Sequence, residues 1–171
     1  GFDKKESLYF AAYKKDVPML QKEFDARKEA GLPVKWLTEE QLQKKYHLKD
    51  AYAGILSQQG GSMDAFKFAH DALQYNCKKG LKVFDKTEIA SVDYSKNGIK
   101  VKTDYGNTIK AKKLIYCNGF ESTEIIKDDF VKLLSTYAIV GERLDKKQKH
   151  LCDTLFWNTA DPYLYMRTTD D

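Results

Sequence analysis

Apolar residues recur at helical spacing in three segments, and each segment carries signals for where a helix begins or ends. The first segment follows Asp16 and stops at Gly31, and a longer amphipathic segment follows Asp64 and stops at Gly80. An aspartate side chain accepts hydrogen bonds from the free N–H groups of a first helical turn, and glycine adopts the left-handed conformation that ends a helix. Between these segments, Thr38-Glu39-Glu40-Gln41 has the residue types of a capping box and predicts a short third helix.

Further along the chain, the apolar period changes from that of a helix to that of a strand. Alternation over residues 83–93, 99–103 and 108–116 predicts three strands. Asn97-Gly98 and Gly106-Asn107 separate them. Such pairs favour tight hairpin turns because they tolerate positive φ angles. The pattern therefore predicts an antiparallel three-stranded meander.

The remaining apolar segments are short and predict strands together with one short helix. The predicted strands cover residues 8–13, 52–57, 136–142, 151–157 and 163–168, and the short helix covers residues 124–127. We expect an α+β fold in which an antiparallel or mixed sheet is covered on one face by the helices after Asp16 and Asp64, with the meander beside it.

The composition is that of an ordinary folded domain. A chain of 171 residues with 42% hydrophobic content can bury one sizeable core. The net charge is +4, arginine occurs only at Arg27, Arg143 and Arg167, and the lysines are interleaved with acidic residues. Because nucleic-acid binders concentrate basic residues on one face, we expect no nucleic-acid partner.

The cysteines and histidines show no metal-ligand spacing. Cys77, Cys117 and Cys152 lie far apart without a CxxC pair, so we expect no metal site, and unpaired cysteines fit a reducing cytoplasm. No apolar run has the length of a membrane span. The chain starts at Gly1 and stops soon after an apolar run, which predicts an excised central piece of a longer protein.

An apolar strand that ends in glycine follows the meander directly. The strand lies within the segment 114–122 and ends at Cys117-Asn118-Gly119. In this order of elements the chain resembles the D-amino-acid oxidase, glycine oxidase and sarcosine oxidase family of FAD-dependent oxidoreductases. Residues 31–38 and the entry to the next helix at 60–64 look like the middle region of that family. Residues 136–140 and 157–169 look like its return strands over the flavin ring.

The resemblance implies a division into domains and an incomplete FAD-binding fold. Residues 1–80 and 124–171 would belong to the substrate domain, and residues 81–123 would supply the meander and a strand of the FAD-binding domain. No GxGxxG motif can be built from the ten glycines of this sequence. The motif that grips the dinucleotide is therefore expected elsewhere in the parent protein.

The resemblance also names the residues that would contact FAD. Ile89 would lie against the adenine, and Cys117, Asn118 and Gly119 would pass close to the cofactor where a strand must end without a Cβ. The family usually has Ala-Thr-Gly or Ala-Ser-Gly at this place, so the contacts of the bulkier Cys117 and Asn118 stay open.

Three residues near the end of the chain are candidates for the substrate side. Arg167, flanked by Tyr163 and Tyr165 at alternating positions, offers a planar fork that matches a carboxylate. Trp157, together with Tyr137, could line an apolar slot above the flavin. The alternative is that the aromatic side chains belong to the core and that Arg167 is a surface residue. No catalytic residue is assigned, because in this family the cofactor carries the chemistry.

The implied activity of the parent protein is oxidation of a C–N bond in a small-molecule amine or amino acid, by hydride transfer to FAD. Whether oxygen or another acceptor takes the electrons stays open. We expect the fragment alone to be inactive and to retain no flavin. The alternative function is a non-enzymatic α+β binding or interaction domain.

Overall fold

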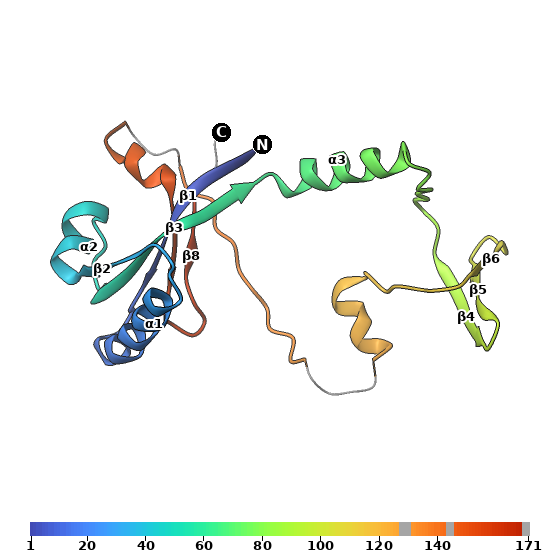
Figure 1. Ribbon diagram of the computed structural model, residues 1–171, viewed down its shortest axis with the longest axis horizontal. Coiled ribbons are helices and arrows are strands. Elements are labelled where there is room, and N and C mark those ends of the chain that lie inside the picture. Colours follow the sequence, from blue (N-terminus) through green and yellow to red (C-terminus); the bar gives the residue numbers. More distant parts are fainter. Residues whose placement is uncertain (127–130, 143–145, 169–171) are drawn as a thin grey trace. The chain divides into compact units, whose positions relative to one another are not determined.

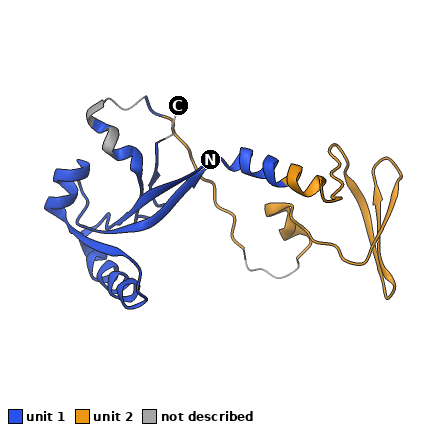
Figure 2. Cartoon of the chain, turned by 45° about the horizontal axis from the view of Figure 1, so that its top comes forward, with its two compact units in different colours: residues 1–72, 141–171 blue, residues 73–140 orange. Residues whose placement is uncertain are grey.

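The computed structural model describes residues 1–126, 131–142 and 146–168, which form two compact units. Unit 1 comprises the described residues within 1–72 and 141–171, and unit 2 comprises those within 73–140 (Figure 2). The boundary at residue 72 falls inside a helix. Whether the segments 1–80, 81–123 and 124–171 act as substrate and cofactor domains stays a prediction.

Unit 1 is built around a five-stranded mixed sheet (Figure 1). Its elements are β1 (Phe2–Phe10), α1 (Val17–Glu29), β2 (Val34–Thr38), α2 (Glu39–Tyr46), β3 (Ala53–Met63), the start of α3 (Ala65–Cys77), β7 (Thr154–Asn158) and β8 (Tyr165–Met166), with 3-10 helices at Lys14–Asp16 and Lys146–Asp153. The strand order is β2-β3-β1-β7-β8. β1 is central because it pairs antiparallel with β3 and parallel with β7.

One face of this sheet packs against α2. Its buried side chains come from β1, β3 and β7 and meet two residues of the helix; they are Leu8, Phe10, Leu56, Phe156, Leu42 and Tyr46. A Cβ added to Gly54 would lie 2.9 Å from Leu8 Cδ1 and 3.2 Å from Leu42 Cδ2. Glycine at this position therefore lets α2 approach the sheet closely.

The opposite face packs against α1. Leu20 of α1 is fully buried with Ile55 of β3, and the rings of Phe24 and Trp36 meet edge to face at a centroid distance of 5.6 Å. The α+β fold and the mixed sheet are confirmed, but the helices are arranged differently from the prediction. α1 and α2 cover opposite faces. α3, which begins after β3 has continued to Met63, has no buried residue among its described positions.

Most of the predicted helix ends are confirmed. Thr38 and Gln41 form the capping box of α2, and Asp64 Oδ1 accepts a hydrogen bond from Lys67 N at 2.9 Å at the start of α3. Gly31, with φ of 76°, follows α1. Asp16 differs, because a 3-10 turn already precedes α1 and its side chain makes no capping bond.

Unit 2 contains the predicted antiparallel meander, with β4 (Ile89–Ser95), β5 (Gly98–Thr103) and β6 (Thr108–Ala111) in that order. The register pairs Val92 with Val101 and Val101 with Ile109, so these apolar side chains share one face. Asp93, Lys100 and Lys110 pair on the other face.

Several predicted strands are shorter or absent. Residues 83–88, 112–118 and 136–142 form no strand, and the strand predicted from residue 151 begins at Thr154, because a 3-10 helix precedes it. In place of the predicted helix at 124–127 there is a 3-10 helix at Gly119–Glu124; Lys127 and Thr169 lie outside the described residues. Among the residues that the structure describes, no helix is both long and apolar enough to cross a membrane.

Candidate functional site

A row of aromatic side chains crosses three strands of unit 1 on the face that carries α1. Tyr9 of β1 pairs with Trp157 of β7, and Trp157 pairs with Tyr165 of β8. The rings of Tyr9 and Trp157 are tilted by 46° with centroids 5.1 Å apart. Trp157 and Tyr165 stay 38% and 51% exposed, so this part of the face is open to a ligand.

A groove of about 620 Å³ lies along this row, and we call it the aromatic groove. It is lined by residues of β1, α1, β7 and the loop after β7, namely Tyr9, Met19, Glu23, Arg27, Trp157, Asn158, Thr159, Ala160 and Tyr163. Small-molecule sites commonly combine such apolar and aromatic walls with a few polar groups.

The polar groups of the aromatic groove come from one side of α1. Arg27 Nε donates a hydrogen bond of 2.7 Å to Glu23 Oε1, one helical turn earlier. The guanidinium carbon of Arg27 lies 5.9 Å from the ring centroid of Tyr9, which is a cation–π distance. The arginine is therefore held by two contacts while it lines the groove.

A set of hydrogen bonds, which we call the Asp16 clamp, fixes the loop after β7. The Thr159 hydroxyl donates to the Asp16 carboxylate and accepts a hydrogen bond of 3.0 Å from Ala12 N. Thr159 N donates to Phe10 O at 3.1 Å. The side chain of Asp16, predicted to cap α1, thus joins the start of the helix to the groove loop instead.

Asn158 closes the same loop on itself. Its Oδ1 accepts hydrogen bonds from Ala160 N at 3.2 Å and from Leu164 N at 2.9 Å. Its backbone N–H donates to Leu164 O at 3.2 Å. The side chain of Asn158, which lines the aromatic groove, therefore also fixes the loop that follows β7.

The structure brings together two of the three predicted substrate residues. Trp157 and Tyr165 are direct cross-strand neighbours, and Trp157 lines the aromatic groove. Arg167 is exposed, follows β8 by one residue and does not line this groove; the cation there is Arg27. A role for these three residues in binding substrate stays a prediction.

Sequence reasoning missed Tyr9, Glu23, Arg27 and Thr159. The sequence offered one indication of Arg27, namely that arginine is rare in this chain and that this one lies on a predicted helix. The signal was insufficient because these residues meet Trp157 only through the parallel pairing of β1 with β7.

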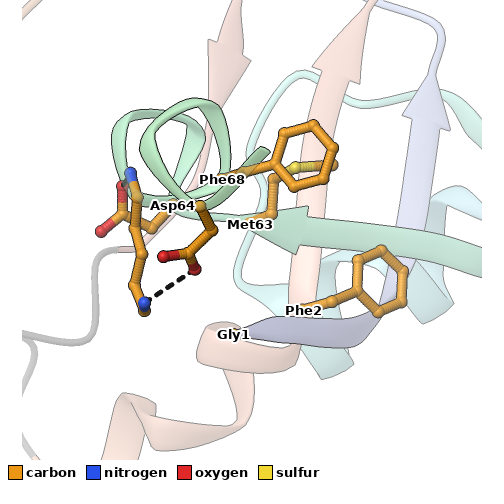
Figure 3. Close-up of a pocket in the computed structure, with 7 residues that line it drawn as sticks. Gly1, Phe2, Met63, Asp64 and Phe68 are labelled. Atoms are coloured by element: carbon orange, nitrogen blue, oxygen red, sulfur yellow. Dashed lines mark hydrogen bonds and ion pairs between the residues drawn. The ribbon is translucent and has the colours of Figure 1, made fainter. Parts of the chain in front are cut away.

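A second, smaller cleft of about 280 Å³ lies where β1 begins, β3 ends and α3 starts (Figure 3). Phe2, Met63 and Phe68 form its apolar part, and Gly1, Asp64, Lys67 and Asp71 complete it. Gly61 lies beneath Phe2, since a Cβ there would come within 2.5 Å of the Phe2 ring. The predicted entry to the helix is thus part of β3, and glycine is needed for contact with β1.

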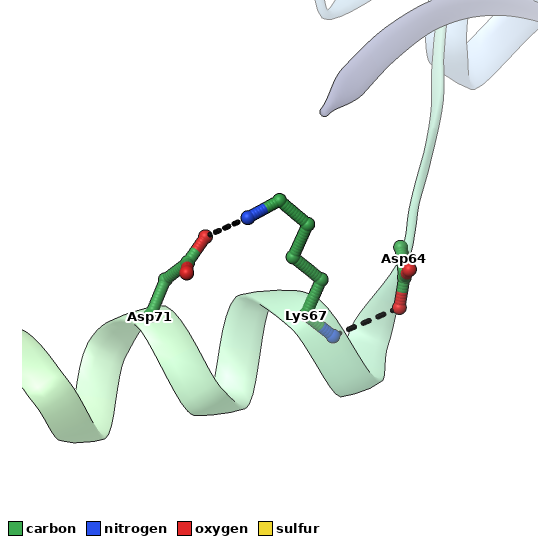
Figure 4. Close-up of polar contacts among 3 residues, drawn as sticks. All are labelled: Asp64, Lys67 and Asp71. Atoms are coloured by element: carbon green, nitrogen blue, oxygen red, sulfur yellow. Dashed lines mark hydrogen bonds and ion pairs between the residues drawn. The ribbon is translucent and has the colours of Figure 1, made fainter.

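The polar side of this cleft is a short network on the first turns of α3. Lys67 Nζ donates to Asp71 Oδ2 at 2.8 Å, while Lys67 N donates to Asp64 (Figure 4). The hydrogen bond to Asp71 raises the pKa of Lys67 above its usual value. Both interactions are exposed and lie within the helix and its cap, so the network stabilises α3 modestly.

The residues predicted to contact FAD lie in unit 2. Ile89 begins β4, and the Cys117 and Asn118 segment lies between β6 and the 3-10 helix that Gly119 starts. Tyr116 reaches β4, because its hydroxyl is 2.6 Å from that of Tyr94. The segment before Gly119 is thereby tied to the strand that carries Ile89.

The backbone at Gly119 is open on the side where a Cβ would lie. Its φ is 63°, and the nearest atom to a Cβ built there is Glu121 Oε2 at 3.8 Å, so the backbone is open on that side. Asn118 Oδ1 is engaged by the Ser122 hydroxyl at 3.0 Å. These residues fit a partial cofactor contact, whereas the phosphates would need a glycine-rich motif that the sequence does not contain. In the described ranges no group of acidic residues, histidines or cysteines is arranged to hold a metal ion.

Solved structures share this fold. L-proline dehydrogenase from P. horikoshii superimposes with a TM-score of 0.75 at 16% identity, over 99% of this chain and 47% of that one. Glycine oxidase from Geobacillus kaustophilus gives 0.59 at 19% identity, over 66% and 30%. NikD, described as an unusual amino acid oxidase essential for nikkomycin biosynthesis, gives 0.62 at 17% identity, over 72% and 32%. The chain therefore spans less than half the length of these proteins.

The sequence itself matches a family model over its whole length. The model, DAO, is described as FAD dependent oxidoreductase and matches residues 1–171, so the chain belongs to this family. No curated protein sequence matches significantly. Membership confirms the resemblance drawn from the meander and the strand-like segment that follows it.

Proposed function

We propose that the whole protein oxidises a C–N bond of an amino acid or amine, with FAD as the electron acceptor. Membership of the FAD dependent oxidoreductase family supports the cofactor and the class of reaction. The names of the similar structures, among them glycine oxidase and L-proline dehydrogenase, support the substrate class. The same family match over residues 1–171 tells against the non-enzymatic alternative.

The observation that carries the substrate side is the aromatic row of Tyr9, Trp157 and Tyr165 beside the aromatic groove. Aromatic walls bind the apolar part of a substrate and exclude water from it. Arg27 supplies a positive charge at one edge for a carboxylate. Together these groups would hold an amino acid in a fixed orientation, as an oxidation carried out by a cofactor requires.

FAD, when bound, would supply the redox chemistry by accepting a hydride from the carbon attached to nitrogen, which leaves an imine. In our proposal Ile89 contacts the adenine, and Cys117, Asn118 and Gly119 pass beside the cofactor, where the open backbone at Gly119 supports the assignment. Because this hydrogen would leave carbon as a hydride, no side chain has to remove a proton from carbon, so the side chains act by positioning. We place the protein in the cytoplasm.

The absorption spectrum of the full-length protein tests this function. We expect a flavin spectrum that is bleached under anaerobic conditions by D- or L-amino acids, N-methyl amino acids or amines. A colourless, folded protein that takes up no added FAD would contradict the proposal. Reoxidation by oxygen, compared with reoxidation by a dye, then separates an oxidase from a dehydrogenase. We expect the 171-residue chain alone to retain no flavin and to be inactive.

A further inference from the structure

The aromatic groove carries two opposite charges side by side, which suggests a ligand of matching form. Glu23 and Arg27 lie one turn apart on α1 and both line the groove. Their hydrogen bond engages Arg27 Nε and Glu23 Oε1. The two outer nitrogens of the guanidinium and Glu23 Oε2 make no further hydrogen bond or ion pair among the described residues, so they can serve a ligand.

An amino acid in its zwitterionic form matches this pair. Its carboxylate can accept two parallel hydrogen bonds from the outer guanidinium nitrogens, and its ammonium can donate to the glutamate. A simple carboxylate would satisfy Arg27 but meet the negative charge of Glu23, and a simple amine would meet the reverse conflict. The paired charges therefore select for a ligand that carries both.

The remaining walls select the side chain of that ligand. Met19, Tyr9, Trp157 and Tyr163 are apolar or aromatic over most of their surface, and the groove volume is about 620 Å³. Such walls gain free energy in proportion to the apolar area they cover, so a large apolar or aromatic side chain binds better than a small one.

The groove is held in shape before any ligand arrives. The Asp16 clamp joins the loop after β7 to β1 and to the start of α1, and Asn158 fixes the turn of the loop. Arg27 is likewise held by Glu23 and the Tyr9 ring. Fixing these groups in advance reduces the entropy that binding would otherwise cost.

We propose that the aromatic groove binds a zwitterionic amino acid with a large apolar or aromatic side chain, with its carboxylate on Arg27 and its ammonium on Glu23. The inference rests on the proposed function and narrows its substrate class. It also assigns the carboxylate anchor to Arg27 instead of Arg167.

Calorimetric titration of the 171-residue chain without flavin tests the inference. The probes are D- and L-phenylalanine, with glycine, phenylacetate and phenethylammonium as partial ligands. We expect one phenylalanine enantiomer to bind at least about tenfold more tightly than each partial ligand. Equal affinity for phenylalanine and phenylacetate would overturn the role of Glu23, and equal affinity for glycine would overturn the role of the apolar walls.

Matched variants locate the anchor. Arg27→Gln and Glu23→Gln should each weaken phenylalanine binding by about tenfold or more, whereas Lys28→Gln, an exposed neighbour with the same change of charge as Arg27→Gln, should leave it unchanged. Arg27→Lys keeps the charge but loses the planar fork, so its affinity for phenylalanine should lie between those of the unchanged chain and Arg27→Gln. Circular dichroism checks that each variant folds. Loss of binding in Arg167→Gln but not in Arg27→Gln would overturn the assignment.

The full-length protein separates this inference from the proposed function. If amino acids bleach the flavin but Arg27→Gln leaves kcat/KM unchanged, the function stands and the groove is not the substrate site. If the chain binds phenylalanine through Arg27 but no amino acid reduces the flavin, the proposed function fails, and so does the groove as a substrate site. We expect Arg27→Gln to raise KM far more than it lowers kcat, since it removes binding common to the ground and transition states.

Discussion

Unit 1 and unit 2 each contain a sheet with an apolar face, but among the described residues helices bury such a face only in unit 1 (Figure 2). Both buried clusters of the described structure lie in unit 1, on the two faces of the sheet. In unit 2 the buried residues among those described are Val101 and Thr103, and Tyr94 and Ile109 stay 64% and 45% exposed. Alternation of apolar residues therefore forms the meander without giving it a core.

The difference shows that a strand pattern and a core are separate properties of a sequence. Unit 1 gains its core because α1 and α2 follow their strands closely and pack back on them. In unit 2, the segment after β6 contributes one hydrogen bond to the meander, between the hydroxyls of Tyr116 and Tyr94. We therefore expect unit 1 to unfold at higher free energy than unit 2.

The largest effect should come from a deep cavity in unit 1. Phe156 is 2% exposed and meets the Tyr46 ring at a centroid distance of 5.5 Å, so Phe156→Ala should cost about 3–5 kcal/mol. Ile109→Ala in unit 2 should cost about 1 kcal/mol or less. Hydrogen exchange measured segment by segment gives both values, and equal losses would remove the contrast between the units.

A smaller effect should follow from overpacking the contact between α2 and the sheet. Gly54→Ala places a Cβ 2.9 Å from Leu8 and should cost about 1–3 kcal/mol in urea unfolding. Gly141→Ala is the control, because no atom lies within 4 Å of the added Cβ. A neutral Gly54→Ala would mean that α2 packs less closely than described.

The Asp16 clamp should contribute less again. Asp16→Ala removes the acceptor of the Thr159 hydroxyl and should cost about 1–2 kcal/mol, as hydrogen bonds to charged groups do. In a double-mutant cycle with Thr159→Val, we expect a coupling free energy of about 1 kcal/mol. Strict additivity of the two variants would show that the clamp does not join α1 to the groove loop.

The smallest effect should come from the Tyr94 and Tyr116 pair of unit 2. The hydrogen bond to Tyr94 is the main cause that raises the pKa of Tyr116, and desolvation adds to it. Because the pKa is raised on folding, the stabilisation is complete below the ordinary tyrosine pKa and is lost as the pH rises through the raised value. Tyr94→Phe should lower the pKa of Tyr116, measured by NMR of labelled tyrosine rings, and an unchanged pKa would place Tyr116 away from β4.

Local features of the fold were predictable from the sequence because their causes are local. The Thr38 capping box, the Asp64 cap and the hairpin turn depend on residues a few positions apart, although the turn lies at Lys96-Asn97, one position before the predicted Asn97-Gly98. The extension of β3 through Gly60 and Gly61 was missed because these glycines pair with Lys5 and Lys4 of β1, which are far away in sequence. For the same reason the pattern could not tell that α1 and α2 take opposite faces.

The candidate site divides in the same way. Trp157 and Tyr165 were found because aromatic residues in alternating segments stand out in a sequence. Arg27 and Glu23 read as an ordinary helical ion pair, and only the pairing of β1 with β7 brings them beside Trp157. Family membership supports the cofactor, but the contacts of Ile89, Cys117, Asn118 and Gly119 stay predictions.

The parallel pairing of β1 with β7 also affects how the chain folds as it is synthesised. β1, β2 and β3 are made early and can form an antiparallel sheet at once, but the other edge of β1 has no partner until residues 154–158 leave the ribosome. Until then the central strand presents an open edge, a template for pairing with another chain. Pairing between strands far apart in sequence is slow to form. We therefore expect nascent unit 1 to need chaperones until β7 has paired with β1, even though the finished unit has a buried core.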